Sequence, residues 1–149
     1  MKSVFNATVQ QNIMGESSYN ATIGFIYTGR VNNTNNLVYY YTNGTSQQAF
    51  TSSNFFQNLD NQWLHIIVVC DYTNKTAKAY RNGVQFQNTQ NHTGTPQFPS
   101  VNRVKYVGSY NQSQFRLTDG SLDEVRIYNR GLSEDEVMAI YNQTKSNYE

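Results

Sequence analysis

The chain has 149 residues, a length that suits one domain, and we expect residues 1–149 to fold as a single unit. Its formal net charge is only +1 and no basic run occurs, so phosphate neutralisation, the main source of nucleic-acid affinity, has little to draw on. No apolar run approaches the roughly 18 residues that a membrane helix needs. These features exclude nucleic-acid binding and membrane insertion as expected functions.

The first half of the chain has the pattern of an all-β protein. Short runs rich in Val, Ile, Tyr, Phe and Thr alternate with clusters of Asn, Gly and Ser, and no convincing helical period precedes Ser133. In Tyr39-Tyr40-Tyr41, strand alternation places Tyr40 on the face opposite to its neighbours. The pattern predicts strands at Val4–Gln10, Ala21–Thr28, Leu37–Thr42 and Gln48–Thr51.

The middle of the chain predicts a three-stranded antiparallel meander. Asn82-Gly83 is a strong hairpin signal, because both central residues of the favoured turn need positive φ. Asp71–Lys75 has the composition of an Asx turn. We therefore expect strands at Leu64–Tyr72, Lys75–Arg81 and Val84–Gln87, followed by a long loop, Gln87–Asn102, that holds both prolines.

The end of the chain predicts two strands, Val104–Tyr110 and Ser121–Asn129, and a short helix. Ser133 with Glu136 three residues later forms a capping box at the start of this helix. Four apolar residues before the helix are expected to contact the core: Leu122, Val125, Ile127 and Leu132.

Cys70 is the only cysteine, so the chain has no internal disulfide framework. It ends an apolar run, and a buried structural thiol is the favoured interpretation. His65 lies five positions away, which is a weak signal for a catalytic thiol. His65 and His92 have no ligand spacing with Cys70, which argues against a zinc site.

Several of these motifs, in this order, resemble the laminin-G-like branch of the concanavalin A-like sandwiches. They are Trp63-Leu-His65, Asp71 at the end of its strand, the Asn82-Gly83 hairpin, Gly108, and the block from Gly120 to Leu132. The resemblance implies an antiparallel jelly-roll β-sandwich closed by a short C-terminal helix. It also implies a binding or adhesion module, because that branch is built mainly of such modules.

One departure from the family pattern concerns the start of the fold. Such domains usually open with one or two strands before the segment aligned to Val4–Gln10, and one of them pairs near the closing strand. An unpaired sheet edge exposes backbone donors and acceptors that proteins normally cover. We therefore expect an open edge that is completed by a neighbouring chain or by a segment absent from this sequence.

Catalysis is not expected. Glycan hydrolysis needs two carboxylates about 5 to 10 Å apart across the scissile bond. The sequence has no acids at the i, i+2, i+4 spacing that would place them on one strand face, since Asp123 and Glu124 are adjacent. Glu134–Glu136 lie in the first helical turn, where negative charge favours the helix dipole.

Asp123 and Glu124 therefore have a structural interpretation, in which one carboxylate pairs with Arg126 or Arg130 or accepts backbone amides. The alternative is a calcium site formed by Asp119 and Asp123 with loop carbonyl groups. Because the chain has only ten acids and no dense Asp cluster, we expect no cofactor, with calcium as the one alternative.

The candidate ligand-binding residues are aromatic and amide side chains near the rim of the sandwich, where loops carry function. Trp63 could stack on a sugar, but its position at a strand start favours the core. The candidates are Tyr19, Tyr40, Tyr110 and Asn111.

Acceptor triplets for Asn-linked sugar are about twice as common as the roughly three or four expected by chance. If some are used, the protein is extracellular or lies on a cell or virion surface. The eight sites are Asn6, Asn20, Asn32, Asn43, Asn74, Asn91, Asn111 and Asn142.

The sequence thus predicts a non-catalytic recognition or adhesion module whose partner is a glycan or a surface protein. The alternative is a structural subunit of a filament, virion or cell-surface layer, whose open sheet edge is completed by a neighbouring chain.

Overall fold

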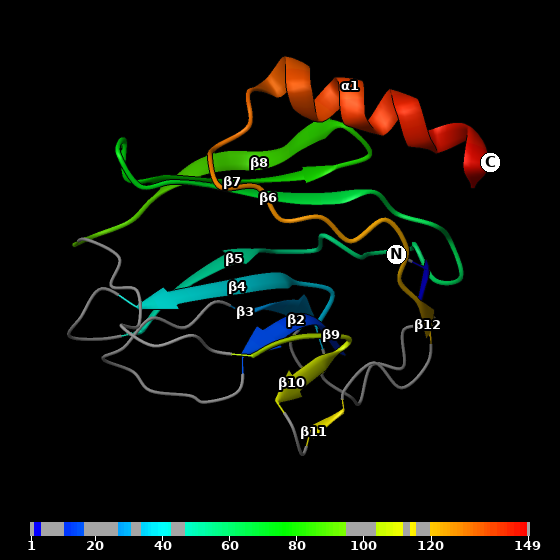
Figure 1. The fold of residues 1–149 in the computed structure, drawn as a ribbon, viewed down its shortest axis with the longest axis horizontal. Coiled ribbons are helices and arrows are strands. Elements are labelled where there is room, and N and C mark those ends of the chain that lie inside the picture. Colours follow the sequence, from blue (N-terminus) through cyan, green and yellow to red (C-terminus); the bar gives the residue numbers. More distant parts are fainter. Residues whose placement is uncertain are drawn as a thin grey trace.

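The computed structural model describes residues 2–3, 11–16, 27–30, 34–42, 47–94, 104–111, 114–115 and 120–148. These residues form two packed antiparallel sheets, and one C-terminal helix lies across the outer face of the smaller sheet (Figure 1). The fold is therefore the antiparallel jelly-roll β-sandwich with a short C-terminal helix that the sequence predicts. No described helix is long and apolar enough to cross a membrane.

The larger sheet has the strand order β5-β4-β3-β2-β9. All its pairings are antiparallel, and β4 sits between β5 and β3 with its full predicted length. Its strands are β2 (Gln11–Glu16), β3 (Tyr27–Arg30), β4 (Leu37–Thr42), β5 (Gln47–Ser52) and β9 (Lys105–Val107).

The smaller sheet is the predicted meander, with the order β6-β7-β8. Its strands are β6 (Ile66–Asp71), β7 (Thr76–Arg81) and β8 (Val84–Asn91). Two short ribbons complete the described strands. One pairs β1 (Lys2–Ser3) with β12 (Gly120–Ser121), and the other pairs β10 (Ser109–Asn111) with β11 (Gln114–Phe115).

Both predicted turns of the meander are confirmed. Asp71 Oδ1 accepts the backbone N–H groups of Thr73 and Asn74 at 3.0 and 2.9 Å, which is the geometry of an Asx turn. Asn82 and Gly83 have φ angles of 52° and 80°, as a tight hairpin requires. Local turn chemistry therefore fixes the antiparallel order of β6, β7 and β8.

The smaller sheet buries side chains on both faces. Val68 and Ala79 point into the sandwich, where they pack with Leu37 of the larger sheet and with Phe55, which follows β5. The next residues along the same strands point outward, where Val69 and Tyr80 pack against the closing helix. Double-sided burial explains why β6 reads as an almost continuous apolar run.

The helix α1 (Glu134–Thr144) starts at the predicted capping box. Glu136 N–H donates to the Ser133 hydroxyl at 3.2 Å, and Ser133 N–H donates to the Glu136 carboxylate at 2.8 Å. Val137 is fully buried beneath the helix, and Lys78 of β7 pairs with Glu134 at 2.9 Å. A short 3₁₀ turn, Lys145–Asn147, follows α1.

Three strand predictions need correction. The strand predicted at Ser121–Asn129 is wrong beyond Ser121, because residues after β12 make no ladder with the described strands. The strand predicted at Val104–Tyr110 is broken at Gly108 into β9 and β10. The predicted loop from Gln87 starts too early, since a bulge with Gln87 at φ 64° lets β8 continue to Asn91.

At the start of the chain, the sequence misses β2, and the predicted strand at Val4–Gln10 lies outside the described residues. Of the strand predicted at Ala21–Thr28, the structure describes Tyr27 and Thr28, which belong to β3. That residues 1–149 form a single domain remains a prediction.

Candidate binding cavity

A cavity of about 970 Å³ separates β6 from residues 122–132, which we name the closing segment. Its volume is at the upper end of the range for ligand pockets. Side chains of α1 lie on one side, and residues of the larger sheet lie on the other. The residues from these two sides are Ile13, Met14, Tyr39, Tyr40, Ile140, Tyr141 and Thr144.

The cavity arises because the closing segment runs beside β6 without pairing to it. One end of the segment is tied to the start of β6, where Tyr148 contacts both Trp63 and Asp123. The other end is tied near the end of β6, where Leu132 packs with Val69. The segment and β6 therefore run in the same direction, and Figure 1 shows the segment in orange between β12 and α1.

Aromatic rings gather at the end of the cavity that contains Trp63. The Trp63 and Tyr148 rings are 4.7 Å apart with planes tilted by 40°. The ring of His65, two residues after Trp63 and just before β6, lies 5.6 Å from the ring of Tyr141. Trp63 is half-buried, so part of its surface stays accessible at this rim.

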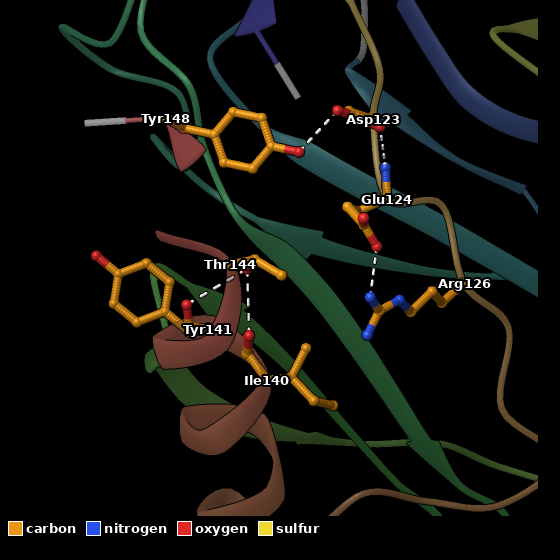
Figure 2. A network of polar contacts seen from close by, with 7 residues as sticks. All are labelled: Asp123, Glu124, Arg126, Ile140, Tyr141, Thr144 and Tyr148. Atoms are coloured by element: carbon orange, nitrogen blue, oxygen red, sulfur yellow. Dashed lines mark hydrogen bonds and ion pairs between the residues drawn. The ribbon is translucent and has the colours of Figure 1, made fainter. Parts of the chain in front are cut away.

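Charged groups complete the same end. Asp123 accepts the Tyr148 hydroxyl and its neighbour's backbone N–H group, each at 2.8 Å, while Glu124 forms an ion pair with Arg126 (Figure 2). The Tyr148 hydrogen bond is the main reason that the Asp123 pKa is lowered, with the Glu124 amide as the second. Both residues therefore make contacts of the predicted kind: Asp123 accepts a backbone amide, and Glu124 pairs with Arg126.

His65 brings an unsatisfied polar atom to the cavity. Burial lowers its pKa, so the imidazole is neutral at neutral pH. Its Nδ1 atom is buried and has no hydrogen-bond partner among the described residues. Buried polar atoms normally have a partner, so this nitrogen is a candidate contact for a bound ligand.

The predicted ligand residues fall into three groups. Tyr40 is half-buried and contributes to the cavity wall. Tyr110 and Asn111 lie in β10, but their side chains are outside the described part of the chain. Tyr19 also lies outside the described residues. The structure therefore brings Tyr40 to the cavity and does not place the other three side chains.

The expectation that Trp63 belongs to the core is wrong. Trp63 is half-buried and is not one of the buried hydrophobic residues among those described, and its ring packs against Tyr148, which follows the 3₁₀ turn. The apolar contacts expected for Val125 and Ile127 are also wrong, since these side chains are 44% and 69% exposed. The second error arises because the closing segment forms no ladder with the described strands.

The predicted calcium pair is described in part. Asp119 lies outside the described residues, and both oxygens of Asp123 already accept hydrogen bonds. Across the described ranges, no three His, Cys, Asp or Glu side chains cluster as metal ligands would. A calcium role for this pair remains an untested alternative.

The two remaining reactive residue types are packed into the structure. Cys70 packs with Tyr39 and Ala77, and burial raises the pKa of its thiol to about 11. His92 is buried, with its ring edge against Phe50 at 5.9 Å. Such contacts favour structural roles for both residues.

Three predicted sugar-acceptor residues are described with their side chains, and all are exposed: Asn74, Asn91 and Asn142. For Asn111 only the backbone is described. Thr144 completes the triplet at Asn142, but its side chain is buried and its hydroxyl donates to carbonyl groups of the helix (Figure 2). The other four, Asn6, Asn20, Asn32 and Asn43, lie outside the described residues.

Sequence reasoning missed Tyr141 and Tyr148 as cavity residues. Both line the cavity together with Thr144. Thr144 and Tyr148 follow Tyr141 by three and seven residues, which is the spacing of one helix face. This spacing is the signal in the sequence that could have shown that the three residues lie together. No comparable signal marked Arg126, whose position depends on the irregular path of the closing segment.

Comparison with known proteins identifies relatives of the fold. Residues 3–138 match a laminin G family model described as the concanavalin A-like lectin/glucanases superfamily. No curated protein matches the sequence. The CBM40 of a Ruminococcus gnavus IT-sialidase has a similar structure, with a TM-score of 0.70 and 16% identity over 93% of this chain and 78% of that one.

The same CBM40 bound to α2,3-sialyllactose gives a TM-score of 0.68 and 16% identity, over 94% of this chain and 78% of that one. Bound to α2,6-sialyllactose, the CBM40 gives a TM-score of 0.67 and 14% identity, over 93% of this chain and 78% of that one. At these identities the similarity establishes a shared fold.

Proposed function

Because this chain belongs to the concanavalin A-like lectin/glucanases superfamily, we propose that it is a non-catalytic recognition module that binds carbohydrate. The ligand lies at the Trp63 end of the cavity. The observation that carries the proposal is the combination, at one rim, of the Trp63 ring with the unsatisfied His65 nitrogen and the charged groups of the closing segment.

This combination suits a sugar ring. Carbohydrates present C–H groups on one face and hydroxyl groups at the edges. An aromatic ring can cover the first, and neutral imidazole, carboxylate or guanidinium groups can bind the second. The CBM40 with the same fold binds sialyllactose, which supports a glycan as the ligand class here.

The absence of catalysis is part of the same proposal. The carboxylates at this rim have structural partners: Asp123 is held by Tyr148, and Glu124 is held by Arg126. A hydrolase would need one acid and one nucleophile or base on opposite sides of the scissile bond. Sugar release that is lost on Asp123→Asn would contradict this part of the proposal.

A glycan array with neutral and sialylated sugars tests the binding. We expect Trp63→Ala to weaken binding about tenfold, the effect of losing about 1.4 kcal/mol. Tyr106→Ala is the matched control, because Tyr106 is a half-buried aromatic residue of β9 outside the cavity wall. Ala variants of Tyr19, Tyr40 and Tyr110 test the candidates predicted from sequence. Binding that survives Trp63→Ala unchanged would exclude the site.

We also propose that the protein works outside the cell or on a cell or virion surface. The excess of acceptor triplets and the exposure of Asn74 and Asn91 support this location. Mass spectrometry of the protein from its natural source tests the proposal. Asn-linked sugar at either residue is the expected result, and unmodified peptides throughout would argue against it.

A second candidate function is that of a structural subunit of a filament, virion or cell-surface layer. One observation favours it, since β6 is the edge of its sheet among the described strands. An edge strand can be completed by a strand from another chain. Light scattering that finds large ordered assemblies would support this candidate, and a stable monomer at high concentration would exclude it.

A further inference from the structure

Tyr148 makes two contacts at the Trp63 rim that a bound sugar would also make. Its ring centroid lies 4.7 Å from that of Trp63, with the planes tilted by 40°. Its hydroxyl donates a 2.8 Å hydrogen bond to Oδ2 of Asp123 (Figure 2). A sugar likewise places an apolar ring face on an aromatic side chain and donates its hydroxyl groups to a carboxylate. The side chain of Tyr148 therefore resembles the proposed ligand in both contacts.

While Tyr148 is in this position, the chain itself uses the groups that a sugar needs. Oδ2 of Asp123 accepts the Tyr148 hydroxyl, and Oδ1 accepts the backbone N–H group of Glu124 at 2.8 Å. The side chain of Glu124 is paired with Arg126. Release of Tyr148 would uncover part of the Trp63 ring and free one oxygen of Asp123. A single movement would therefore provide both contacts for a sugar.

The turn that carries Tyr148 is separate from the packing that holds α1 on the smaller sheet. Thr144 is the last buried residue of the helix, and the 3₁₀ turn Lys145–Asn147 buries no residue. The Tyr148 N–H group donates to the Lys145 carbonyl at 3.1 Å, which is a bond within the turn.

Movement of Tyr148 would therefore leave the packing of α1 intact. The hydrogen bond to Asp123 is exposed, so water competes for both of its groups. Segments that bury few side chains open at a small part of the free energy of global unfolding. These features favour a side chain that can leave the rim while the sandwich stays folded.

We propose that Tyr148 is a lid on the carbohydrate site, held closed by Trp63 and Asp123 and displaced by the bound sugar. The inference rests on the proposed carbohydrate function and adds a closed state to that site. The apparent affinity of a site falls when only a fraction of the molecules is open. Loss of the lid should therefore tighten binding, whereas loss of an ordinary wall residue weakens it.

The fluorescence of Trp63, the only tryptophan of the chain, measures the lid without any sugar. Acrylamide quenches tryptophan fluorescence more strongly when the ring is open to solvent. Tyr148→Ala should raise the quenching constant about twofold, because the covering ring is gone. Tyr148→Phe keeps the ring and loses the hydrogen bond, so its effect should be smaller. Asn147→Ala, at an exposed position of the same turn, is the control and should leave quenching unchanged.

A glycan array with neutral and sialylated sugars, read over a series of protein concentrations, measures the effect on binding. Tyr148→Ala should lower the apparent Kd about threefold for the glycans that the wild type binds. Tyr148→Phe should lower it by a smaller factor, and Asn147→Ala should not change it. Trp63→Ala should weaken binding both alone and together with Tyr148→Ala, because the lid acts on the site that contains Trp63.

Three outcomes would overturn the lid while sugar binding stands. Weaker binding by Tyr148→Ala would make Tyr148 part of the binding surface. Unchanged affinity would show that the sugar binds without displacing it, and unchanged quenching would show that its ring does not shield Trp63. An array on which neither the wild type nor Tyr148→Ala binds any glycan would overturn the carbohydrate function, and with it the role of the lid. Increased quenching would then still show that Tyr148 covers Trp63.

Discussion

The hydroxyl of Tyr148 donates a 2.8 Å hydrogen bond to Asp123 and so joins the end of the chain to the closing segment across the cavity rim. The same ring packs on Trp63, so one residue connects three separate parts of the chain. The contact fixes one end of the cavity, while the packing of Leu132 on Val69 fixes the other.

Tyr148→Phe should raise the Asp123 pKa toward its ordinary value, because the hydroxyl is the main group that lowers it. A carboxyl with a lowered pKa stabilises the fold above its unfolded pKa, and this contribution is lost as the pH falls through the folded value. The variant should therefore lose less stability than the wild type on acidification below pH about 4. Carboxyl NMR titration measures the shift, and Tyr141→Phe, which removes a hydroxyl from α1 rather than from Tyr148, is the control.

Gly83→Ala should destabilise the protein by more than the roughly 1–2 kcal/mol of a left-handed backbone conformation. Gly83 has φ 80°, and an added Cβ would lie 2.9 Å from Cδ1 of Tyr141 and 3.0 Å from Sδ of Met138. Gly94→Ala is the matched control, since Gly94 has a similar φ of 76° but is exposed. If urea unfolding shows the same loss of stability for Gly83→Ala and Gly94→Ala, the side chains of α1 move to accommodate the new methyl group without further cost.

Glu136→Gln should flatten the dependence of stability on pH in acid. Arg130 and the Ser133 amide lower the pKa of Glu136 to about 2, from an ordinary value of 4.5. Its contribution is complete above pH 4.5 and is lost as the pH falls toward 2. Melting temperatures of wild type and variant should converge over this range. Asp135→Asn removes a charge from the same helical turn without touching the capping box and is the control variant.

Cys70 should react slowly with iodoacetamide in the folded protein. Its thiol has a pKa of about 11 against an ordinary 9.0, so near pH 8 about 100-fold less thiolate is present than in the unfolded chain. Mass spectrometry over time, with a sample in denaturant for comparison, gives both rates. Equal rates would show that the thiol is accessible, contrary to its packing against Tyr39 and Ala77.

Removal of calcium with a chelator should leave the melting temperature unchanged. Both oxygens of Asp123 accept hydrogen bonds, and a calcium ion there would have to displace Tyr148 or the Glu124 amide. A rise in melting temperature on adding calcium, but not magnesium, would instead support the Asp119 and Asp123 site.

Local signals predicted the parts of the fold whose determinants are close in sequence. The Asx turn at Asp71, the hairpin at Asn82-Gly83 and the capping box at Ser133 are each formed by residues within a few positions of one another. The structure confirms all three. Tertiary pairing decides the elements that were missed or misplaced.

The strand β2, with Asn12, Gly15 and Glu16, has weak strand propensity and is defined by its pairing with β3 and β9. The closing segment has the opposite character, since Val125 and Ile127 favour a strand that no described partner completes. The candidate site could not be predicted for the same reason, because its residues are distant in the sequence. Trp63 and Tyr148 are 85 positions apart, and only the folded chain brings them together.

The burial of Thr144 bears on when sugar could be attached to the last acceptor triplet. An enzyme that modifies Asn142 has to reach the threonine two residues later, which is enclosed once α1 has docked. Attachment there would have to happen on the growing or newly released chain. Exposed Asn74 and Asn91 stay open to modification at later times.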